Sequence, residues 1–324
     1  MSWNVFVTRR IPDAGLALLE KQCDTVDIFP EDRVMTHAEI MKEVPSRDGL
    51  LCLLTDTIDE RIIRAGEKLR IIANYAVGYN NIDMAVASAH RIMVTNTPGV
   101  LTDATADLAW ALILSICRRI IESDRFTRAG SFQGWAPKLL RGGDLSGRTI
   151  GIVGAGRIGS AVARRAAGFD MKILYTGRSD NRGLEQALGA RRVPLETLLR
   201  TADVISLHVP LTDETRHLIG KEELSVMKKT AYLINTSRGP VVDEEALVKA
   251  LRNEEIAAAG LDVFEEEPKV HPGLVTLDSV VLTPHTGSAT YGTRDRMAVM
   301  AAENLIAGLE GKRPPNIVNP DILS

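Results

Sequence analysis

Residues 149–166, TIGIVGAGRIGSAVARRA, place a β-branched run, a glycine loop and an amphipathic run in direct succession. The first run predicts a buried strand, and the run from residue 160 predicts a helix. Between them, residues 154–159 match G-x-G-x-x-G, whose glycines permit a tight turn, close approach of a pyrophosphate and packing of helix on strand. We interpret this stretch as the centre of a dinucleotide-binding fold, with a bare strand-to-helix turn as the alternative. The predicted cofactor-binding loop is Gly154, Ala155, Gly156, Arg157, Ile158 and Gly159.

The pattern of strands and helices extends on both sides of this loop. After it, apolar runs separated by helical periodicity predict five more strands, at 172–175, 204–209, 232–235, 257–261 and 280–282. Before it, strands are expected at 4–7, 48–54, 70–76 and 92–94, with helices at 14–23, 37–44, 59–65 and 82–90. Because 324 residues exceed what one core usually supports, we expect an α/β protein with two doubly wound parallel-sheet domains; one large α/β domain is the alternative.

Two segments lie outside this alternation. A long helix is expected over 104–122, capped by Thr102 or Asp103, where it would bridge two domains or subunits. The stretch 130–147 contains Phe132 and Trp135 without periodicity, which fits a functional loop and an ordinary surface connection equally well. A last helix is expected over 290–309.

The composition favours a small-molecule function. Thirty-nine basic and 42 acidic residues leave a net charge of −3, so neither nucleic acid nor an anionic membrane is an expected partner. The amino terminus lacks a signal-peptide layout, and the longest apolar run, 108–117, is about half of a membrane span. The three cysteines lack CxxC spacing, so we expect core thiols in a reducing compartment, the cytoplasm, and no metal site.

The residues after the second strand of the nucleotide-binding half indicate which cofactor is used. The sequence there is YTGRS, residues 175–179, with Gly177 where a carboxylate would bind the ribose 2′-hydroxyl of NAD. Arg178 follows, and its guanidinium suits a 2′-phosphate. We therefore predict that NADPH or NADP is preferred and that NADH is possible. The alternative is an NAD enzyme in which Arg178 and Arg182 are solvated surface cations.

Three polar residues just beyond predicted strands form a chemically complete set. They are Arg238 in TSRGP, Glu267 in VFEEEP and His285 in TPHTGS. Each has a plain alternative, because an arginine can cap a carbonyl, Glu267 is one of three adjacent glutamates, and a lone histidine is often structural. Together they suit hydride addition to a 2-oxo acid: His285 would donate the proton, Glu267 would orient the imidazole and favour its charged form, and Arg238 would grip the substrate.

The spacing of this set resembles that of a known family. The arginine follows Asn-x-Ser, the glutamate lies 29 residues later (267 − 238 = 29), and Pro284-His285-Thr286-Gly287-Ser288 contains the histidine. Over nearly its whole length the chain resembles the D-isomer-specific 2-hydroxyacid dehydrogenases, in particular their glyoxylate and hydroxypyruvate reductases. The resemblance implies reduction of glyoxylate or hydroxypyruvate to glycolate or D-glycerate by a homodimer. It also implies a Rossmann-type cofactor domain, 99–287, and a discontinuous flavodoxin-like substrate domain, 1–98 with 288–324, with a cleft between them.

The resemblance further assigns roles to individual residues. It implies that Leu53 and the backbone of Val77 and Gly78 bind the substrate, and that Trp135 reaches the site of the partner subunit. It implies that Asp262 holds the nicotinamide carboxamide. Further cofactor contacts are implied for Thr102, Gly177, Arg178, Ser179, His208, Val209, Pro210, Thr215, Asn235, Thr236 and Ser237. One departure is Thr286, where an isoleucine is more usual; it either alters substrate preference or has no effect.

Other functions fit parts of the same pattern. A non-catalytic, NAD(H)-sensing binding protein can share this fold and a similar triad; against it, we expect no appended interaction tail. A methyltransferase would explain the glycine loop and would leave the triad without a role. Within the enzyme class, 2-ketogluconate, phosphoglycerate and bulkier 2-oxo acids compete with glyoxylate and hydroxypyruvate as substrates.

Overall fold

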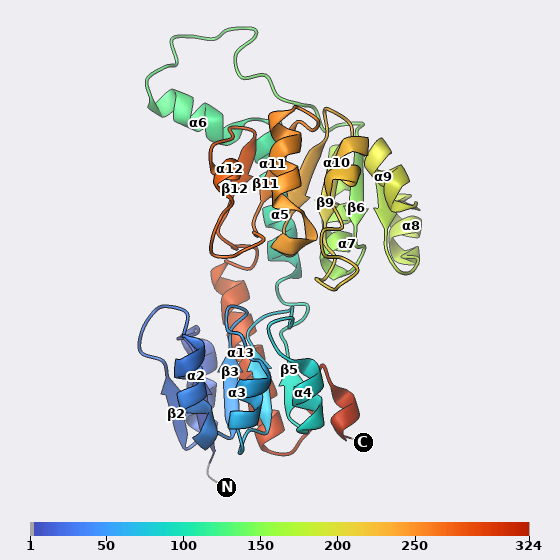
Figure 1. Cartoon of the computed structure of the whole chain (residues 1–324). Helices are drawn as coiled ribbons and strands as arrows, with labels where there is room; N and C mark the ends of the chain where they lie inside the picture. Colours follow the sequence, from blue (N-terminus) through green and yellow to red (C-terminus); the bar gives the residue numbers. More distant parts are fainter. Residues whose placement is uncertain (1–2, 324) are drawn as a thin grey trace. The chain divides into compact units, whose positions relative to one another are not determined.

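The computed structural model describes residues 3–323, which form two compact units (Figure 1). One unit comprises the chain up to Leu101 and from Ser288 onward, and the other comprises Thr102–Gly287. Each unit contains one sheet whose strands all pair in parallel. In each unit separate hydrophobic clusters lie on the two faces of the sheet, as expected for doubly wound folds.

The first unit has a five-stranded sheet in the order β2-β1-β3-β4-β5, which is the flavodoxin-like order. Its strands are β1 (Asn4–Val7), β2 (Thr25–Ile28), β3 (Gly49–Cys52), β4 (Ile71–Asn74) and β5 (Met93–Thr95). The sequence did not predict β2. This edge strand has no buried residue, so it lacks the apolar run by which the other strands were found.

Helices cover both faces of this sheet. Val5 and Val7 of β1 pack toward α1 (Asp13–Gln22) and α13 (Tyr291–Leu309), whereas Phe6 packs toward α2 (His37–Glu43), α3 (Glu60–Ala65) and α4 (Met84–Ala89). The chain thus returns to this unit through α13. Close packing of α1 on α13 needs Gly15, because a Cβ there would overlap the backbone of Ala298. Two short 3₁₀ turns complete the unit, η1 (Val44–Ser46) and η4 (Pro320–Leu323).

The second unit has a seven-stranded sheet in the order β12-β11-β10-β9-β6-β7-β8. Outward from β6 this is the classic dinucleotide-binding order with one further strand. The strands are β6 (Thr149–Val153), β7 (Lys172–Thr176), β8 (Arg191–Arg192), β9 (Val204–Leu207), β10 (Tyr232–Asn235), β11 (Ala258–Leu261) and β12 (Val280–Leu282). The sequence predicted six of these strands. It missed β8, which consists of two exposed arginines.

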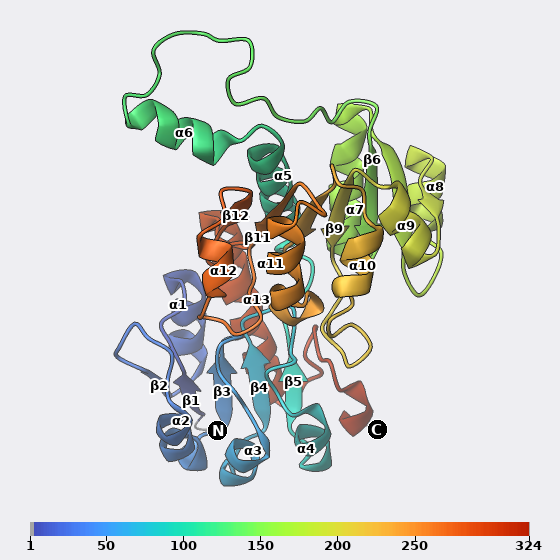
Figure 2. The same cartoon turned by 45° about the horizontal axis from the view of Figure 1, so that its top comes forward.

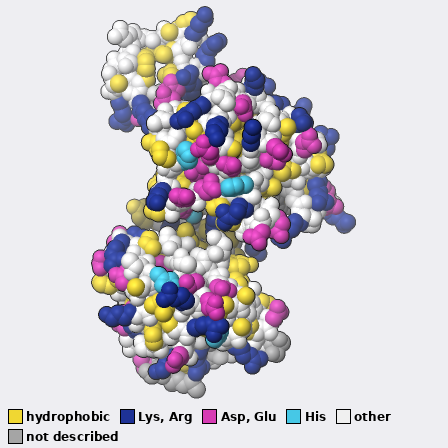
Figure 3. Space-filling model, in the orientation of Figure 1, with side chains coloured by type: hydrophobic (Ala, Val, Ile, Leu, Met, Phe, Trp, Pro, Cys, Tyr) yellow, Lys and Arg dark blue, Asp and Glu magenta, His cyan; other side chains and the backbone are white. Residues whose placement is uncertain are grey.

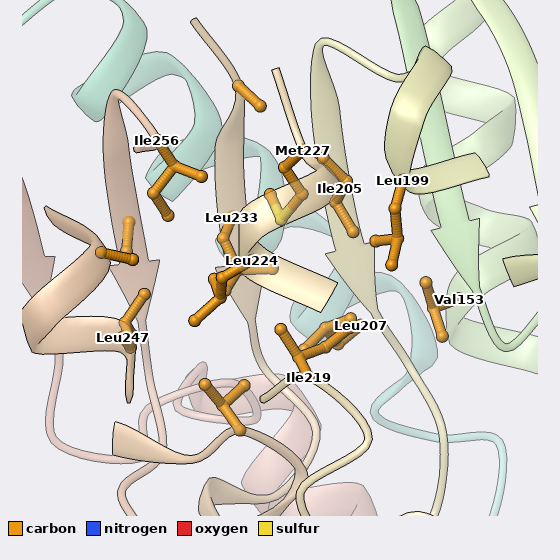
Figure 4. Close-up of a cluster of buried hydrophobic side chains, with 14 of the residues drawn as sticks. Val153, Leu199, Ile205, Leu207, Ile219, Leu224, Met227, Leu233, Leu247 and Ile256 are labelled. Atoms are coloured by element: carbon orange, nitrogen blue, oxygen red, sulfur yellow. The ribbon is translucent and has the colours of Figure 1, made fainter. Parts of the chain in front are cut away.

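Two cores enclose the seven-stranded sheet. Figure 4 shows one of them, in which Leu224 of α10 lies beside Leu233 of the sheet and Leu247 of α11 belongs to the same cluster. The helices of this face are α9 (Leu195–Thr201), α10 (Lys221–Val226), α11 (Glu244–Arg252) and α12 (Pro272–Val275). The other face is covered by α5 (Thr102–Cys117), α7 (Arg157–Ala166) and α8 (Arg182–Leu188). Two 3₁₀ turns, η2 (Ala167–Phe169) and η3 (Gly239–Val241), follow α7 and β10.

The prediction of one long helix over 104–122 was wrong. Helix α5 begins at Thr102, which is its first residue rather than its cap, and a second helix, α6 (Ile120–Arg128), follows it. Between them Arg119 adopts a left-handed backbone with φ of 51°. A residue distant in the sequence stabilises this break: the Gly143 N–H donates a hydrogen bond of 2.9 Å to the Cys117 carbonyl at the end of α5.

Helix α6 and the loop that follows form an arm. No residue of α6 is buried, and Figures 1 and 2 both show the arm extending away from the seven-stranded sheet. Phe132 and Trp135 on this loop are 56% and 85% exposed. Among residues 3–323, no helix has both the length and the apolar composition needed to span a membrane. On the face drawn in Figure 3, basic and acidic side chains are interspersed.

Candidate active site

The predicted cofactor-binding and catalytic residues follow strands of the second unit. Since these strands are parallel, the loops after β6, β7, β9, β10, β11 and β12 all leave the sheet at its carboxyl edge. In open α/β sheets this edge is where ligands bind.

The glycine loop shows why each of its glycines is needed. Gly154 has a φ of 97°, and a Cβ there would lie 2.8 Å from the His208 carbonyl. A Cβ on Gly159 would overlap the carbonyl of Gly154. At Gly156, by contrast, a Cβ would meet no atom within 4 Å. The outer two glycines are therefore required by packing, whereas the middle one faces the open space that a pyrophosphate would need.

The amino end of α7 completes an anion-binding cradle. Gly156 caps this ten-residue helix, and no acidic residue lies in its first turn. Within the part of the chain that the structure describes, the N–H groups of Gly156, Arg157 and Ile158 donate to no protein acceptor. Free N–H groups at the positive end of a helix dipole favour a phosphate. The cradle fits the pyrophosphate of a dinucleotide.

The turn after β7 lies against this loop. A Cβ on Gly177 would be 3.8 Å from the Ala155 nitrogen, and Arg178 and Ser179 are exposed. Arg192 pairs with the Asp180 carboxylate at 2.8 Å and donates to the Gly177 carbonyl at 2.7 Å. Arg192 thus neutralises the Asp180 carboxylate of this turn and also holds the backbone of the turn at Gly177.

Asn181 joins the same turn to the glycine loop, and sequence reasoning missed it. Its amide donates to the Ala155 carbonyl at 2.9 Å and to the Ser160 hydroxyl at 3.0 Å, while its oxygen caps α8. The only sequence signal was an asparagine preceding a helical pattern, which predicts a cap and no more. Arg192 carried no signal, because its role depends on the position of β8 in the sheet.

The loop after β9 contributes a neutral histidine. Burial lowers the pKa of His208 to about 3, so the ring carries no charge. Its Nε2 lies 2.8 Å from the Ser206 hydroxyl, and its Nδ1 has no hydrogen-bond partner among residues 3–323. Further along this loop the Thr215 hydroxyl donates to the Pro210 carbonyl at 2.7 Å and closes the turn that follows Val209.

Asn235 shapes the turn that carries Arg238. The Asn235 side chain is buried; its amide donates to the Arg238 carbonyl at 2.9 Å, and its oxygen accepts from the N–H and hydroxyl of Ser237. The Thr236 hydroxyl is buried without a partner among the described residues. Gly239 follows, and a Cβ there would overlap the backbone of Phe264. This close approach brings the Arg238 turn against the segment that leads to Glu267.

Glu267 and His285 are in direct contact. The Glu267 Oε2 lies 2.9 Å from the His285 Nδ1, and Oε1 accepts from the Phe264 N–H at 3.0 Å. Burial opposes ionisation of Glu267, but the hydrogen bond and charge of His285, the Phe264 N–H and the charge of Arg238 hold the pKa of this carboxyl below its ordinary value. Glu267 is therefore an anion at neutral pH.

Arg238 remains a cation beside this pair. Burial lowers its pKa, and the charge of Glu267 opposes that shift. The Arg238 Nη1 donates to the Ser237 carbonyl at 2.7 Å. A guanidinium stays protonated in proteins. The structure thus combines a permanent cation, an anion and an imidazole, of which the anion and the imidazole are hydrogen-bonded.

Asp262 organises the loop that carries His285. Its carboxylate is 1% exposed and accepts hydrogen bonds from the Thr283 hydroxyl at 2.6 Å, the Thr286 N–H at 2.7 Å and the Gly287 N–H at 2.8 Å. The Thr286 hydroxyl adds a longer contact of 3.2 Å to the same carboxylate. His285 has a left-handed backbone, with φ of 52°, which is uncommon for a residue with a side chain. The hydrogen bonds to Asp262 hold this conformation.

The remaining predicted residues lie elsewhere. Leu53, Val77 and Gly78 are in the loops after β3 and β4 of the five-stranded sheet. Thr102 is the first residue of α5, and Trp135 lies on the exposed arm. Within residues 3–323, no group of three or more His, Cys, Asp or Glu side chains is arranged to hold a metal ion.

The fold and this edge define a class: a dinucleotide-binding α/β oxidoreductase. Residues 110–287 match the model of the D-isomer specific 2-hydroxyacid dehydrogenase, NAD binding domain. A glyoxylate reductase from Thermococcus litoralis is 51% identical, with 100% of this chain and 99% of the relative covered. The chain belongs to the D-isomer-specific 2-hydroxyacid dehydrogenase family and is an NAD(P)-dependent enzyme of that family.

Solved structures support the same assignment. The TT0316 protein from Thermus thermophilus is 44% identical with a TM-score of 0.91, covering 97% of this chain and 99% of that one. An NADPH-dependent glyoxylate/hydroxypyruvate reductase from Sinorhizobium meliloti, solved with NADP and malonate, is 33% identical with a TM-score of 0.86, covering 98% and 97%. The predicted fold of two parallel-sheet α/β domains is confirmed.

The glycine loop gives a direct test of cofactor binding. We expect Gly156→Ala to raise the Kd for NADPH by about tenfold or more, because its methyl group would occupy the open space of the cradle. The melting temperature should stay within about 2 °C of the wild type, since the methyl meets no atom. Fluorescence titration and thermal unfolding measure the two quantities. Gly168→Ala, also in open space, is the matched control; equal Kd values in both variants would contradict the assignment.

Proposed function

We propose that this enzyme reduces glyoxylate or hydroxypyruvate to the 2-hydroxy acid, with NADPH as the preferred cofactor. The observation that carries the proposal is the hydrogen-bonded pair of Glu267 and His285 beside the Arg238 cation, in a chain about half identical to named glyoxylate reductases. Reduction of 2-ketogluconate or another 2-oxo acid would use the same groups and differ in the size of the substrate.

The proposed chemistry divides among these residues. NADPH, when bound, supplies the hydride that is added to the carbonyl carbon. His285 donates a proton to the carbonyl oxygen, so that the 2-oxo acid gains one hydride and one proton. The Glu267 anion stabilises the charged imidazole and fixes its orientation. Arg238 binds the carboxylate and carbonyl oxygens of the substrate and stabilises the negative charge that develops on the carbonyl.

The proposed binding site for the substrate carboxylate consists of the backbone N–H groups of Val77 and Gly78, beside Leu53. Neither N–H donates to an acceptor among the residues that the structure describes. Unpaired N–H groups in succession form a concavity that suits an anion.

The decisive test of the reaction is a substrate panel with a histidine variant. We expect oxidation of NADPH, followed at 340 nm, when glyoxylate or hydroxypyruvate is added, with weaker turnover of 2-ketogluconate. His285→Gln should lower kcat by about 10²-fold or more, since general acid catalysis is lost, while the Kd for NADPH is retained. Absence of turnover by a wild type that binds NADPH would favour a sensing protein. Full turnover by the variant would remove His285 from the mechanism.

The cofactor preference rests on Arg178. This side chain is exposed at the turn after β7, and the carboxylate of that turn is paired with Arg192. A guanidinium there can bind a 2′-phosphate. We expect Arg178→Ala to raise the KM for NADPH about tenfold or more and to leave that for NADH within about twofold. Steady-state kinetics with both cofactors measure this; Arg182→Ala, exposed nearby, is the control. Equal effects on both cofactors would contradict the assignment.

The exposed arm supports a proposed homodimer in which Trp135 reaches the site of the partner subunit. Ile120, Ile121, Phe132 and Trp135 are 49%, 40%, 56% and 85% exposed, an apolar set that a second copy would cover. At the base of the arm a cavity of about 570 Å³ is lined by residues that include Ile121, Arg141 and Tyr232.

Light scattering in solution tests the dimer. We expect a dimeric wild type, a monomeric Ile121→Asp variant because the new charge would be buried at the interface, and a dimeric Trp135→Ala variant with reduced turnover. Val275→Asp, which adds the same charge at a position 64% exposed in the same unit, should stay dimeric. A monomeric wild type would exclude the proposed arrangement.

A cytoplasmic location is proposed from the cysteines. Cys23, Cys52 and Cys117 are free thiols, and burial raises the pKa of Cys117 to about 12. Unreactive free thiols suit a reducing compartment.

A further inference from the structure

Two asparagine side chains lie behind the loop to which we assign the substrate carboxylate. Asn74, at the end of β4, and Asn96, after β5, are 1% and 8% exposed. The Asn96 amide donates to the Val77 carbonyl at 2.7 Å, and the Asn74 amide donates to the Gly78 carbonyl at 2.9 Å. The preceding carbonyl, that of Ala76, accepts from the Thr97 N–H at 2.8 Å.

These three hydrogen bonds fix three successive peptide planes. In a trans peptide the carbonyl and the following N–H point in opposite directions. The carbonyls of Ala76, Val77 and Gly78 are all held toward the interior, so the N–H groups of Val77, Gly78 and Tyr79 must point the other way. Among residues 3–323, none of these N–H groups donates a hydrogen bond. The asparagines therefore orient two of these donors, the N–H groups of Gly78 and Tyr79, and the Thr97 N–H orients the third, that of Val77.

A third asparagine extends this framework to the neighbouring loop. The Asn81 oxygen accepts from the Asn74 amide at 3.2 Å, and its own amide donates to the carbonyls of Leu53 and Asp56 at 3.1 and 3.0 Å. The buried Asp56 carboxylate in turn accepts from the Leu53 N–H at 2.7 Å. The loop that contains Leu53 is thereby tied to the Val77 loop through side-chain amides.

We propose that Asn74 and Asn96 are positioning residues for the carboxylate of the 2-oxo acid. Asn96 orients the N–H group of Gly78 and Asn74 orients that of Tyr79, and neither side chain contacts the substrate. The inference rests on the proposed function, in which this loop binds the carboxylate. An asparagine that only stabilises the fold would affect both reaction partners alike, whereas a positioning residue of this loop affects the 2-oxo acid alone.

The chain offers a matched control in the same unit. Asn319 is 7% exposed, and its amide donates to the Ile92 carbonyl at 2.9 Å while its oxygen accepts from the Val94 N–H. Replacing either asparagine by aspartate removes the amide donor at nearly constant volume. Asn96→Asp and Asn319→Asp should therefore lose stability to a similar degree.

The experiment compares these variants in the full-length enzyme. We expect Asn96→Asp to raise the KM for glyoxylate and the Ki for oxamate by about tenfold or more, with kcat within about threefold and the Kd for NADPH unchanged. Asn319→Asp should leave KM and Ki within about twofold of the wild type. Equal KM changes in the two variants, or a change in kcat alone, would overturn the proposal.

Two further measurements keep the test decisive. If Asn96→Asp does not fold, Asn96→Ser removes the donor without a buried charge and should raise KM in the same direction; an unchanged KM would refute the role. If the wild type turns over no 2-oxo acid, the proposed function fails, and calorimetry with oxalate then tests the carboxylate site alone. Oxalate binding that Asn96→Ser weakens would support the positioning role, and binding that it leaves unchanged would reject it.

Discussion

Backbone-to-backbone packing at the carboxyl edge of the seven-stranded sheet is the constraint on which the candidate site depends. Gly154 lies against the His208 carbonyl, Gly159 against Gly154, and Gly239 against Phe264, and in each case a Cβ would displace main chain. The first two contacts close the glycine loop on its strand and helix. The third sets the Arg238 turn against the segment that carries Glu267. Because these glycines have no side chain, loops from different strands can approach each other closely. Their packing therefore determines where the charged side chains of neighbouring residues lie.

The electrostatics of the site follow from this packing. Burial alone would favour the neutral forms of both Arg238 and Glu267, and each opposes that shift in the other. Two histidines of this edge, His208 and His285, differ in their surroundings. His208 is enclosed without a charged partner and is neutral, whereas His285 contacts the Glu267 anion and is partly exposed. An imidazole that must exchange a proton needs such a partner and some access; His285 has both, and His208 has neither.

The sequence predicted the elements whose signals are local. Strands with buried apolar runs and the glycine loop were found, and the strand ends indicated Arg238, Glu267 and His285 as neighbours at one edge. Elements that depend on distant contacts were missed. The edge strand β2 and the arginine pair of β8 have no apolar pattern. The break between α5 and α6 depends on a hydrogen bond from Gly143 to Cys117, which no helical periodicity reveals.

The proposed anion sites use main-chain N–H groups in both units, and the two sets of N–H groups are oriented in different ways. At α7 the helix leaves its first N–H groups without acceptors, so the geometry follows from helix formation itself. At Val77–Tyr79 there is no helix, and free N–H groups in a loop would ordinarily turn toward any nearby carbonyl or side chain. Buried amides of Asn96 and Asn74 prevent this at Gly78 and Tyr79 by engaging the carbonyls of Val77 and Gly78, and the Thr97 N–H engages the carbonyl of Ala76. In a helix, the backbone hydrogen bonds of the helix orient the free N–H groups. In this loop, side chains orient them. The asparagines therefore belong to no local motif that the sequence alone would reveal.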